Sequence, residues 1–257
     1  MIRNDNILVV VLLGIFCAFC ETINAQKTYI VCVGLNVNRD GEDPLPCSRT
    51  DMKDFANFYH KYNGSDVFML LDANATRSNI IKILKQQFAK STAADEIIFA
   101  YSGHGFDGGV STYNNNEVLY CSEAQQIMLS AKARRKMMFI NSCHSGSFMD
   151  KNKDSKDKRS KYNRNSKVLL FLSSRPTEFS WESSDMNNSY FFHFLLKGLK
   201  GEADGAAGTV KDDKVTAREL FDYVAPRVTN MSGGIQHPQM TGGWKSFNDD
   251  MVIVNVK

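Results

Sequence analysis

The chain has 257 residues, of which 43% are hydrophobic and 23% are charged, and its formal net charge at pH 7 is +3. This composition excludes a disordered chain, and the length suffices to bury the core of one α/β domain. The small net charge, without basic and aromatic residues interleaved, gives no indication of nucleic-acid binding.

The N-terminal segment is typical of a secretory signal peptide. Arg3 precedes an apolar stretch at residues 7–19, and the polar pair Glu21 and Thr22 leads to Ala25. We predict cleavage after Ala25 and export to the periplasm, the cell surface or the medium. The apolar stretch is shorter than the roughly 20 residues of a spanning helix. An uncleaved anchor is therefore the weaker interpretation, and no stable membrane span is expected.

Alternating strands and helices are predicted along residues 26–257. Six apolar, β-prone runs predict strands at residues 28–33, 67–71, 96–101, 136–140, 168–172 and 251–256. Helical spacing of apolar residues and the capping residues Thr76 and Thr216 predict helices at 50–62, 76–88, 124–133, 189–199 and 216–228. Such alternation predicts a mostly parallel, six-stranded sheet covered on both faces, which is a three-layer α/β/α domain.

Residues 150–167 form the clearest change in composition, because they contain eight Lys or Arg and no aliphatic residue. Such a run cannot contribute to a core, so we expect an exposed linker. It separates residues 26–149 from residues 168–257. Neither part alone has the elements to cover its own sheet, and we therefore predict one domain interrupted by a basic linker.

Four cysteines follow the predicted signal peptide, namely Cys32, Cys47, Cys121 and Cys143. Their spacing shows no dense disulfide framework, although their number is even. The five histidines lack the spacing of a zinc site, so no metal site is expected. Residues 204–219 lack oxygen ligands at the positions that an EF-hand requires, and a solvated turn is the preferred interpretation.

Two predicted strands end in loops that carry reactive side chains. The run at 96–101 is followed by His104, and the run at 136–140 is followed by Cys143. The carboxyl ends of parallel strands meet at one edge of a sheet, so we expect these two side chains to meet there. A nearby imidazolium and free backbone amides are expected to lower the pKa of the thiol. The pair predicts a cysteine hydrolase.

Each residue of this pair has a chemical role. The Cys143 thiolate is the nucleophile, and His104 transfers the proton to the departing amine. The backbone amides of Gly105 and Cys143 are the predicted oxyanion hole. His144 is a competing base, but adjacent residues point apart, and we expect His144 to shape the loop instead.

These motifs resemble the caspase-like cysteine peptidases of clan CD, most closely the metacaspase and bacterial orthocaspase branch. The resemblance is carried by Ser102-Gly103-His104-Gly105 and Cys143-His144-Ser145-Gly146-Ser147, and it extends from about Thr28 to the C-terminus. Supporting segments are Leu45 to Asp51, Ser173-Ser174-Arg175-Pro176, Leu199-Lys200-Gly201 with Ala203-Asp204, and His237-Pro238-Gln239. The resemblance implies a caspase-like fold and an endopeptidase with His104 and Cys143 as its catalytic dyad.

The resemblance also implies a pocket for a basic P1 side chain. Asp51 matches the acidic residue of the first loop, Ser48 replaces a common cysteine, and Ser102 matches the small polar residue before Gly-His. Asn141 stands where metacaspases usually carry a second aspartate, and one carboxylate holds a guanidinium less firmly than two. The alternative role of Asp51 is a carboxylate that stabilises a helix N-terminus.

Caspase relatives are processed between their two parts, which implies activation by self-cleavage in the linker. The candidate sites are Lys151, Lys153, Lys156, Lys158, Arg159, Lys161, Arg164 and Lys167. No cofactor is required by these residues; some metacaspases need calcium, but no calcium site is defined here.

Two alternatives to this function stay open. One is a clostripain- or legumain-like peptidase with another P1 preference, and the other is a non-catalytic caspase-like module that binds partners through its cleft. The expected partner is a peptide or protein substrate, and the sequence does not distinguish a monomer from a dimer.

Overall fold

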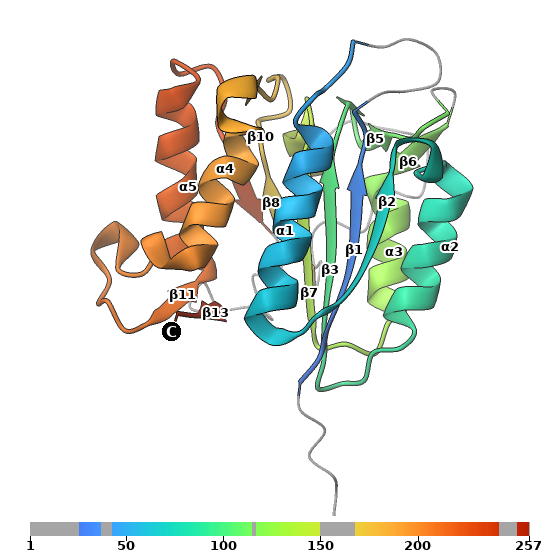
Figure 1. Ribbon diagram of the computed structural model, residues 1–257, viewed down its shortest axis with the longest axis horizontal. Helices are drawn as coiled ribbons and strands as arrows, with labels where there is room; N and C mark the ends of the chain where they lie inside the picture. Colours follow the sequence, from blue (N-terminus) through green and yellow to red (C-terminus); the bar gives the residue numbers. More distant parts are fainter. Residues whose placement is uncertain (1–25, 37–42, 115–116, 150–167, 242–250, 257) are drawn as a thin grey trace, which may run out of the picture.

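The computed structural model describes residues 26–36, 43–114, 117–149, 168–241 and 251–256. Its centre is a six-stranded sheet in the order β12-β8-β7-β3-β1-β2 (Figure 1). These strands are β1 (Thr28–Gly34), β2 (Asp66–Leu71), β3 (Glu96–Ser102), β7 (Arg135–Asn141), β8 (Leu169–Leu172) and β12 (Gln239–Thr241). All neighbouring pairs are parallel except β12 and β8, which are antiparallel. The predicted three-layer, mostly parallel fold is confirmed.

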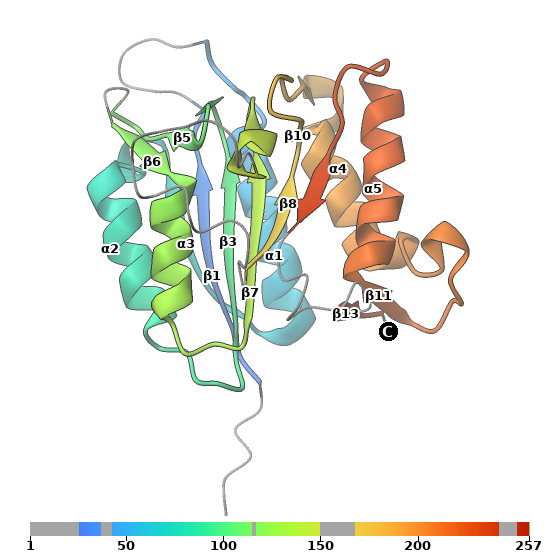
Figure 2. The same ribbon diagram turned by 180° about the vertical axis from the view of Figure 1, so that it is seen from behind.

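Helices cover both faces of this sheet (Figures 1 and 2). They are α1 (Ser48–Asn63), α2 (Arg77–Phe88), α3 (Cys121–Ser130), α4 (Tyr190–Lys197) and α5 (Ala217–Met231). Helices α1, α4 and α5 pack on one face, and α2 and α3 pack on the other. Alternate residues of each strand enter the two cores; in β1, Ile30 joins the first core and Val31 joins the second. Burial of both faces explains why these strands are continuous apolar runs.

Two predicted caps form as expected. The Thr76 hydroxyl accepts a hydrogen bond from the Asn79 backbone N–H at 3.3 Å, before α2. Thr216 and Glu219 form a reciprocal capping box at the start of α5. Such caps satisfy backbone N–H groups that have no partner inside the helix, and they fix where each helix begins.

Short elements complete the described part of the chain. A small sheet contains β4 (Gly105–Phe106), β5 (Gly109–Ser111) and β6 (Val118–Tyr120), and two ribbons pair β9 (Glu182–Ser183) with β10 (Asn188–Ser189) and β11 (Lys214–Thr216) with β13 (Val252–Asn255). Single turns of 3-10 helix are η1 (Asp72–Asn74), η2 (Ser145–Met149), η4 (Ser184–Met186) and η6 (Ala206–Gly208), and η5 (Gly198–Glu202) is a π-helical turn.

The sixth strand of the sheet differs from the one predicted. The run at 251–256 forms β13, which pairs with β11 outside the central sheet. The place at the edge of the central sheet is taken by β12, which pairs with β8 from Gln239 to Thr241. A strand of three residues directly after Pro238 has too few apolar positions to be recognised from periodicity.

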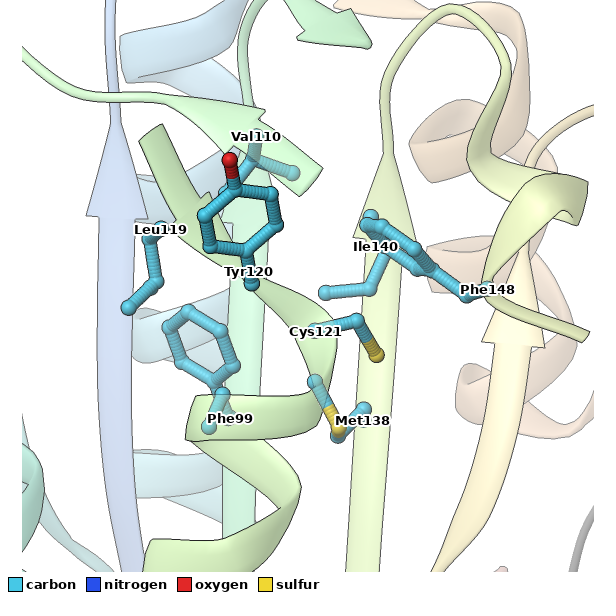
Figure 3. Close-up of a pocket in the computed structure, with 9 residues that line it drawn as sticks. Phe99, Val110, Leu119, Tyr120, Cys121, Met138, Ile140 and Phe148 are labelled. Atoms are coloured by element: carbon cyan, nitrogen blue, oxygen red, sulfur yellow. The ribbon is translucent and has the colours of Figure 1, made fainter. Parts of the chain in front are cut away.

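A small apolar pocket lies between the small sheet, α3 and the central sheet (Figure 3). Phe99, Met138 and Ile140 of the central sheet line it together with Cys121 and Phe148. Phe148 belongs to η2, which directly follows Cys143 and His144 in the chain, so the pocket lies next to the Cys143 loop.

Three predictions fall partly or wholly outside the described residues. The predicted signal peptide at residues 1–25 lies outside the described residues, and so does the linker at 150–167 with its eight candidate cleavage sites. The division of the domain into two parts by this linker stays a prediction. Within the described ranges, no helix has both the length and the apolar character needed to cross a membrane.

Candidate active site

The His104 and Cys143 loops leave neighbouring strands at the same edge of the sheet. Parallel pairing of β3 with β7 places Ser102 directly beside Asn141, the last residue of each strand. The Gly103 N–H then donates to the Asn141 carbonyl oxygen at 3.2 Å. The two loops therefore begin in contact, as the strand-end argument predicts.

Gly105 brings the two loops together. A Cβ atom at this position would lie 2.6 Å from the carbonyl oxygen of Cys143 and would also collide with the Ser142 side chain. Since real Cβ atoms do not approach backbone oxygens so closely, only glycine fits here. The glycine after His104 thus allows the His104 loop to approach the Cys143 loop closely.

His104 is held by its backbone and by its ring. Its carbonyl oxygen accepts hydrogen bonds from the Tyr101 hydroxyl at 2.8 Å and from the Ser111 N–H at 3.0 Å. Its Nε2 lies 2.8 Å from the carbonyl oxygen of Asp43. A carbonyl oxygen only accepts, so Nε2 carries the proton and Nδ1 is the basic nitrogen of the neutral ring.

Cys143 is partly exposed, unlike the other described cysteines, which are buried. Burial of the sulfur raises its thiol pKa above the ordinary value, and the backbone N–H groups of Ser180 and of Cys143 itself oppose this by hydrogen bonding to it. The amide contribution is the one predicted. The net direction is opposite to the prediction, because the cost of desolvating a thiolate outweighs the two amides.

His144 shapes the nucleophile loop. It has a left-handed backbone with φ of 59°, which is uncommon for a residue with a Cβ. Its N–H donates to the Glu178 carbonyl at 2.8 Å, and its Nδ1 donates to the Pro176 carbonyl at 2.9 Å. The ring is thus engaged with the loop after β8, in agreement with the role expected for it.

Three of the four predicted P1-pocket residues are joined by hydrogen bonds. The Asn141 Nδ2 donates to the Ser102 hydroxyl at 3.1 Å, and this hydroxyl donates to the Asp51 carboxylate at 2.7 Å. Asp51 is fully buried in the first turn of α1. Its other oxygen accepts from the Asn188 Nδ2 at 3.1 Å and from the Ser189 N–H at 3.0 Å. Both roles predicted for Asp51 therefore remain, since it lies in the first helical turn and faces the site.

Burial dominates the electrostatics of Asp51. It raises the carboxyl pKa from 3.8 to about 7, against the opposing hydrogen bonds from Ser189, Ser102 and Asn188. These donors are all neutral. Among the contacts that the structure describes, no cation therefore balances the negative charge of ionised Asp51. A cationic ligand would stabilise this charge.

Nearby buried polar atoms lack partners within the described part of the chain. They are the Ser48 hydroxyl, the Asn141 Oδ1 and the Ser142 hydroxyl. Ser48 is only 1% exposed and Asn141 only 6%. Unpaired buried polar atoms are costly. The carbonyl Oδ1 of Asn141 can accept a hydrogen bond from a ligand N–H, but as a neutral acceptor it binds a cation less strongly than an aspartate would.

A second carboxylate, Glu182, was not predicted. The pairing of β9 with β10 places it opposite Ser189, the residue whose N–H binds Asp51. Burial raises the pKa of Glu182, while a hydrogen bond from the Cys47 backbone N–H and the charge of His104 lower it. Burial raises the thiol pKa of Cys47, and the charges of Glu182 and Asp51 raise it further. Glu182 is therefore close enough to Cys47 and to His104 for charge interactions with both.

The acidic turn considered as a calcium loop is stabilised by the protein itself. Asp204 accepts hydrogen bonds from the backbone N–H groups of Asp212 and Asp213, at 3.0 and 3.1 Å. Glu219 accepts from the Gly205 N–H at 3.2 Å and from Thr216. These carboxylates order the turn through hydrogen bonds with the backbone. No cluster of three metal-ligating side chains occurs among the residues that the structure describes.

The central sheet, its helices and the two loops that meet at one edge of the sheet have the arrangement of a caspase-like domain. The family model of the caspase domain matches residues 30–243, and the chain belongs to this family. A solved structure supports the fold: protein GSU0716 from Geobacter sulfurreducens is similar with a TM-score of 0.60 and 19% identity, over 84% of this chain and 92% of that one. A comparison with curated proteins gave no match.

Proposed function

We propose that the protein is an exported cysteine endopeptidase that cleaves peptide bonds after Arg or Lys. The observation that supports this most is the contact of the His104 and Cys143 loops through Gly105, inside a caspase domain. The proposal of export depends on the signal peptide predicted at residues 1–25.

Catalysis proceeds by covalent chemistry at Cys143. The thiol is protonated in the free site, because its pKa is raised by burial. As the substrate carbonyl approaches, Nδ1 of His104 accepts the thiol proton, and the sulfur forms a bond to the carbonyl carbon. The Gly105 and Cys143 amides stabilise the oxyanion. Nδ1 then gives the proton to the leaving amine, the C–N bond breaks, and water hydrolyses the thioester to release the acid and the thiol.

The preference for a basic P1 side chain follows from the charges of the pocket. Asp51 supplies negative charge at its base, and Glu182, which is less buried, supplies it closer to His104. The unpaired Oδ1 of Asn141 adds a neutral acceptor. Glu182 thus supplies the second carboxylate that is missing at position 141, where this chain has Asn141. Two anions and an acceptor match the donors of a guanidinium or an ammonium group.

We further propose that the enzyme is a zymogen that cleaves its own basic linker at residues 150–167. A variant with all eight Lys and Arg of the linker changed to Gln is expected to remain one chain. Cys143→Ala protein is also expected to stay uncut until wild-type enzyme is added. Normal maturation of the Gln variant, or cutting of purified Cys143→Ala alone, would contradict self-cleavage.

The function is tested with fluorogenic peptides that end in Arg, Lys, Asp or Asn. Turnover of the Arg and Lys peptides is expected, with loss in Cys143→Ala and in His104→Ala. Cys121→Ala is the matched control, because its buried thiol lines the apolar pocket instead of the active site. Turnover of Asp or Asn peptides would retain the dyad and reject the pocket, and it would favour the alternative of a peptidase with another P1 preference. No turnover by linker-cut protein, with or without calcium, would favour the non-catalytic binding module.

A further inference from the structure

The two segments Ser173–Pro176 and His237–Gln239 meet behind the nucleophile loop, and Glu178 joins them. One oxygen of its carboxylate lies 2.7 Å from Nδ1 of His237. The other accepts the backbone N–H of His237 at 2.8 Å and that of Arg175 at 3.1 Å. A half-buried carboxylate therefore ties the turn after β8 to the chain entering β12.

The turn held by Glu178 supports the residue next to the nucleophile. The carbonyl oxygens of Pro176 and Glu178 accept the two hydrogen bonds from His144. These bonds hold His144 in its left-handed conformation, which is not maintained without such restraint. Gly146 packs against the same turn, where a Cβ would lie 2.6 Å from the Ser174 carbonyl. The course of the chain on the C-terminal side of Cys143 thus depends on the turn.

The same turn also presents groups to Cys143 directly. Two residues after Glu178, the Ser180 backbone N–H lies close enough to the Cys143 sulfur to lower its thiol pKa. The Ser180 hydroxyl donates to the Ser142 carbonyl at 2.8 Å. A shift of the turn would therefore move a donor to the thiolate as well as the backbone on both sides of the nucleophile.

Electrostatics strengthen this contact. Burial alone would raise the carboxyl pKa of Glu178, but the N–H groups of Arg175 and His237 and the charge of His237 lower it overall. The Arg175 guanidinium lies 3.6 Å from the same carboxylate. Hydrogen bonds to a charged acceptor are stronger than bonds between neutral groups.

We propose that Glu178 and His237 form a clamp that holds the Cys143 loop in its reactive geometry. Both are positioning residues, since their contacts reach Cys143 only through His144 and Ser180. The role of this clamp in catalysis rests on the proposed peptidase function. Its effect on the chemical reactivity of the Cys143 thiol can be tested separately.

The test measures alkylation of Cys143 by iodoacetamide, followed by mass spectrometry, alongside kcat/KM for the Arg peptide. His237→Ala and Glu178→Gln are each expected to slow alkylation and to lower kcat/KM by about tenfold, because a hydrogen bond to a charged group is lost. His237→Asn is expected to stay within about twofold of wild type, because the Asn Nδ2 donor replaces the ring Nδ1. The buried thiols of Cys32, Cys47 and Cys121 provide an internal check that each variant is folded.

Glu219→Gln is the matched control, because Glu219 also accepts several hydrogen bonds within a turn but lies on α5. It is expected to leave Cys143 alkylation unchanged. Alkylation by His237→Ala and Glu178→Gln at or above the wild-type rate would overturn the clamp, and so would failure of His237→Asn to restore it. If wild type cleaves no peptide while the alkylation pattern is as expected, the proposed function fails and the clamp stands.

Discussion

Replacing Asp51 by Asn should stabilise the protein at neutral and alkaline pH while it weakens cleavage after Arg. The Asp51 carboxyl is fully buried, and its pKa is about 7 in the folded protein, compared with an ordinary value of 3.8. As the pH rises from 3.8, the unfolded chain ionises this group at no cost, while the folded chain keeps it protonated. Folded stability is therefore lost progressively up to a pH near 7, and the loss is complete above it.

The size of this effect follows from the difference between the two pKa values. A pKa rise from 3.8 to about 7 corresponds to about 4 kcal/mol of free energy of unfolding, at 1.36 kcal/mol for each pH unit. Asn does not titrate, so the variant escapes this loss. Its Oδ1 can still accept from Asn188 and Ser189, and its Nδ2 can donate to the Ser102 hydroxyl, so the surroundings need little rearrangement.

The assay is urea unfolding at pH 5 and pH 8, in a Cys143→Ala background that prevents self-cleavage. The stability of Asp51→Asn relative to the parent should increase between pH 5 and pH 8 by most of the roughly 3 kcal/mol that falls in this window. Asp54→Asn is the control, since Asp54 shares the Asn188 side chain at 3.2 Å but is less buried. A stability difference between Asp51→Asn and the parent that does not change with pH would refute the raised pKa of the buried Asp51 carboxyl.

Two further predictions concern the pocket and the loop contact. Glu182→Gln should raise KM for Arg peptides by about tenfold, because one of the two pocket charges is lost; stopped assays over a range of peptide concentrations measure this, and an unchanged KM would place Glu182 outside the pocket. Gly105→Ala should reduce kcat by about 100-fold through displacement of the nucleophile loop, whereas Gly108→Ala, whose added Cβ would have no neighbour within 4 Å, should retain kcat and lose only about 1 kcal/mol of stability.

Those parts of the fold that depend on local patterns are predictable from the sequence. The strands β1, β3, β7 and β8 are apolar runs buried on both faces, and Thr76 and Thr216 cap helices as expected. The edge strand β12 is different, because it is defined by pairing with a strand more than 60 residues earlier. No local signal in Gln239-Met240-Thr241 expresses that contact.

The candidate site divides in the same way. The positions of His104 and Cys143 follow from two strand ends, which the sequence shows directly. Glu182 could not be found in this manner, because a hairpin brings it to α1 and the His104 loop from a segment without a motif of its own. The direction of the Cys143 pKa depends on burial, which is a property of the packed structure.

The distribution of the site over the chain limits what cleavage of the linker can do. His104, Cys143 and Asp51 precede residues 150–167, whereas Ser180 and Glu182 follow them, so neither part contains a whole site. The two parts are held together by pairing of β7 with β8 and by hydrogen bonds such as that from the Ser142 N–H to the Ser173 hydroxyl at 3.1 Å. These contacts do not involve the linker. Cleavage would therefore leave the dyad and the pocket assembled, and its effect on activity should appear as a change in substrate access or in the loop that ends at Met149.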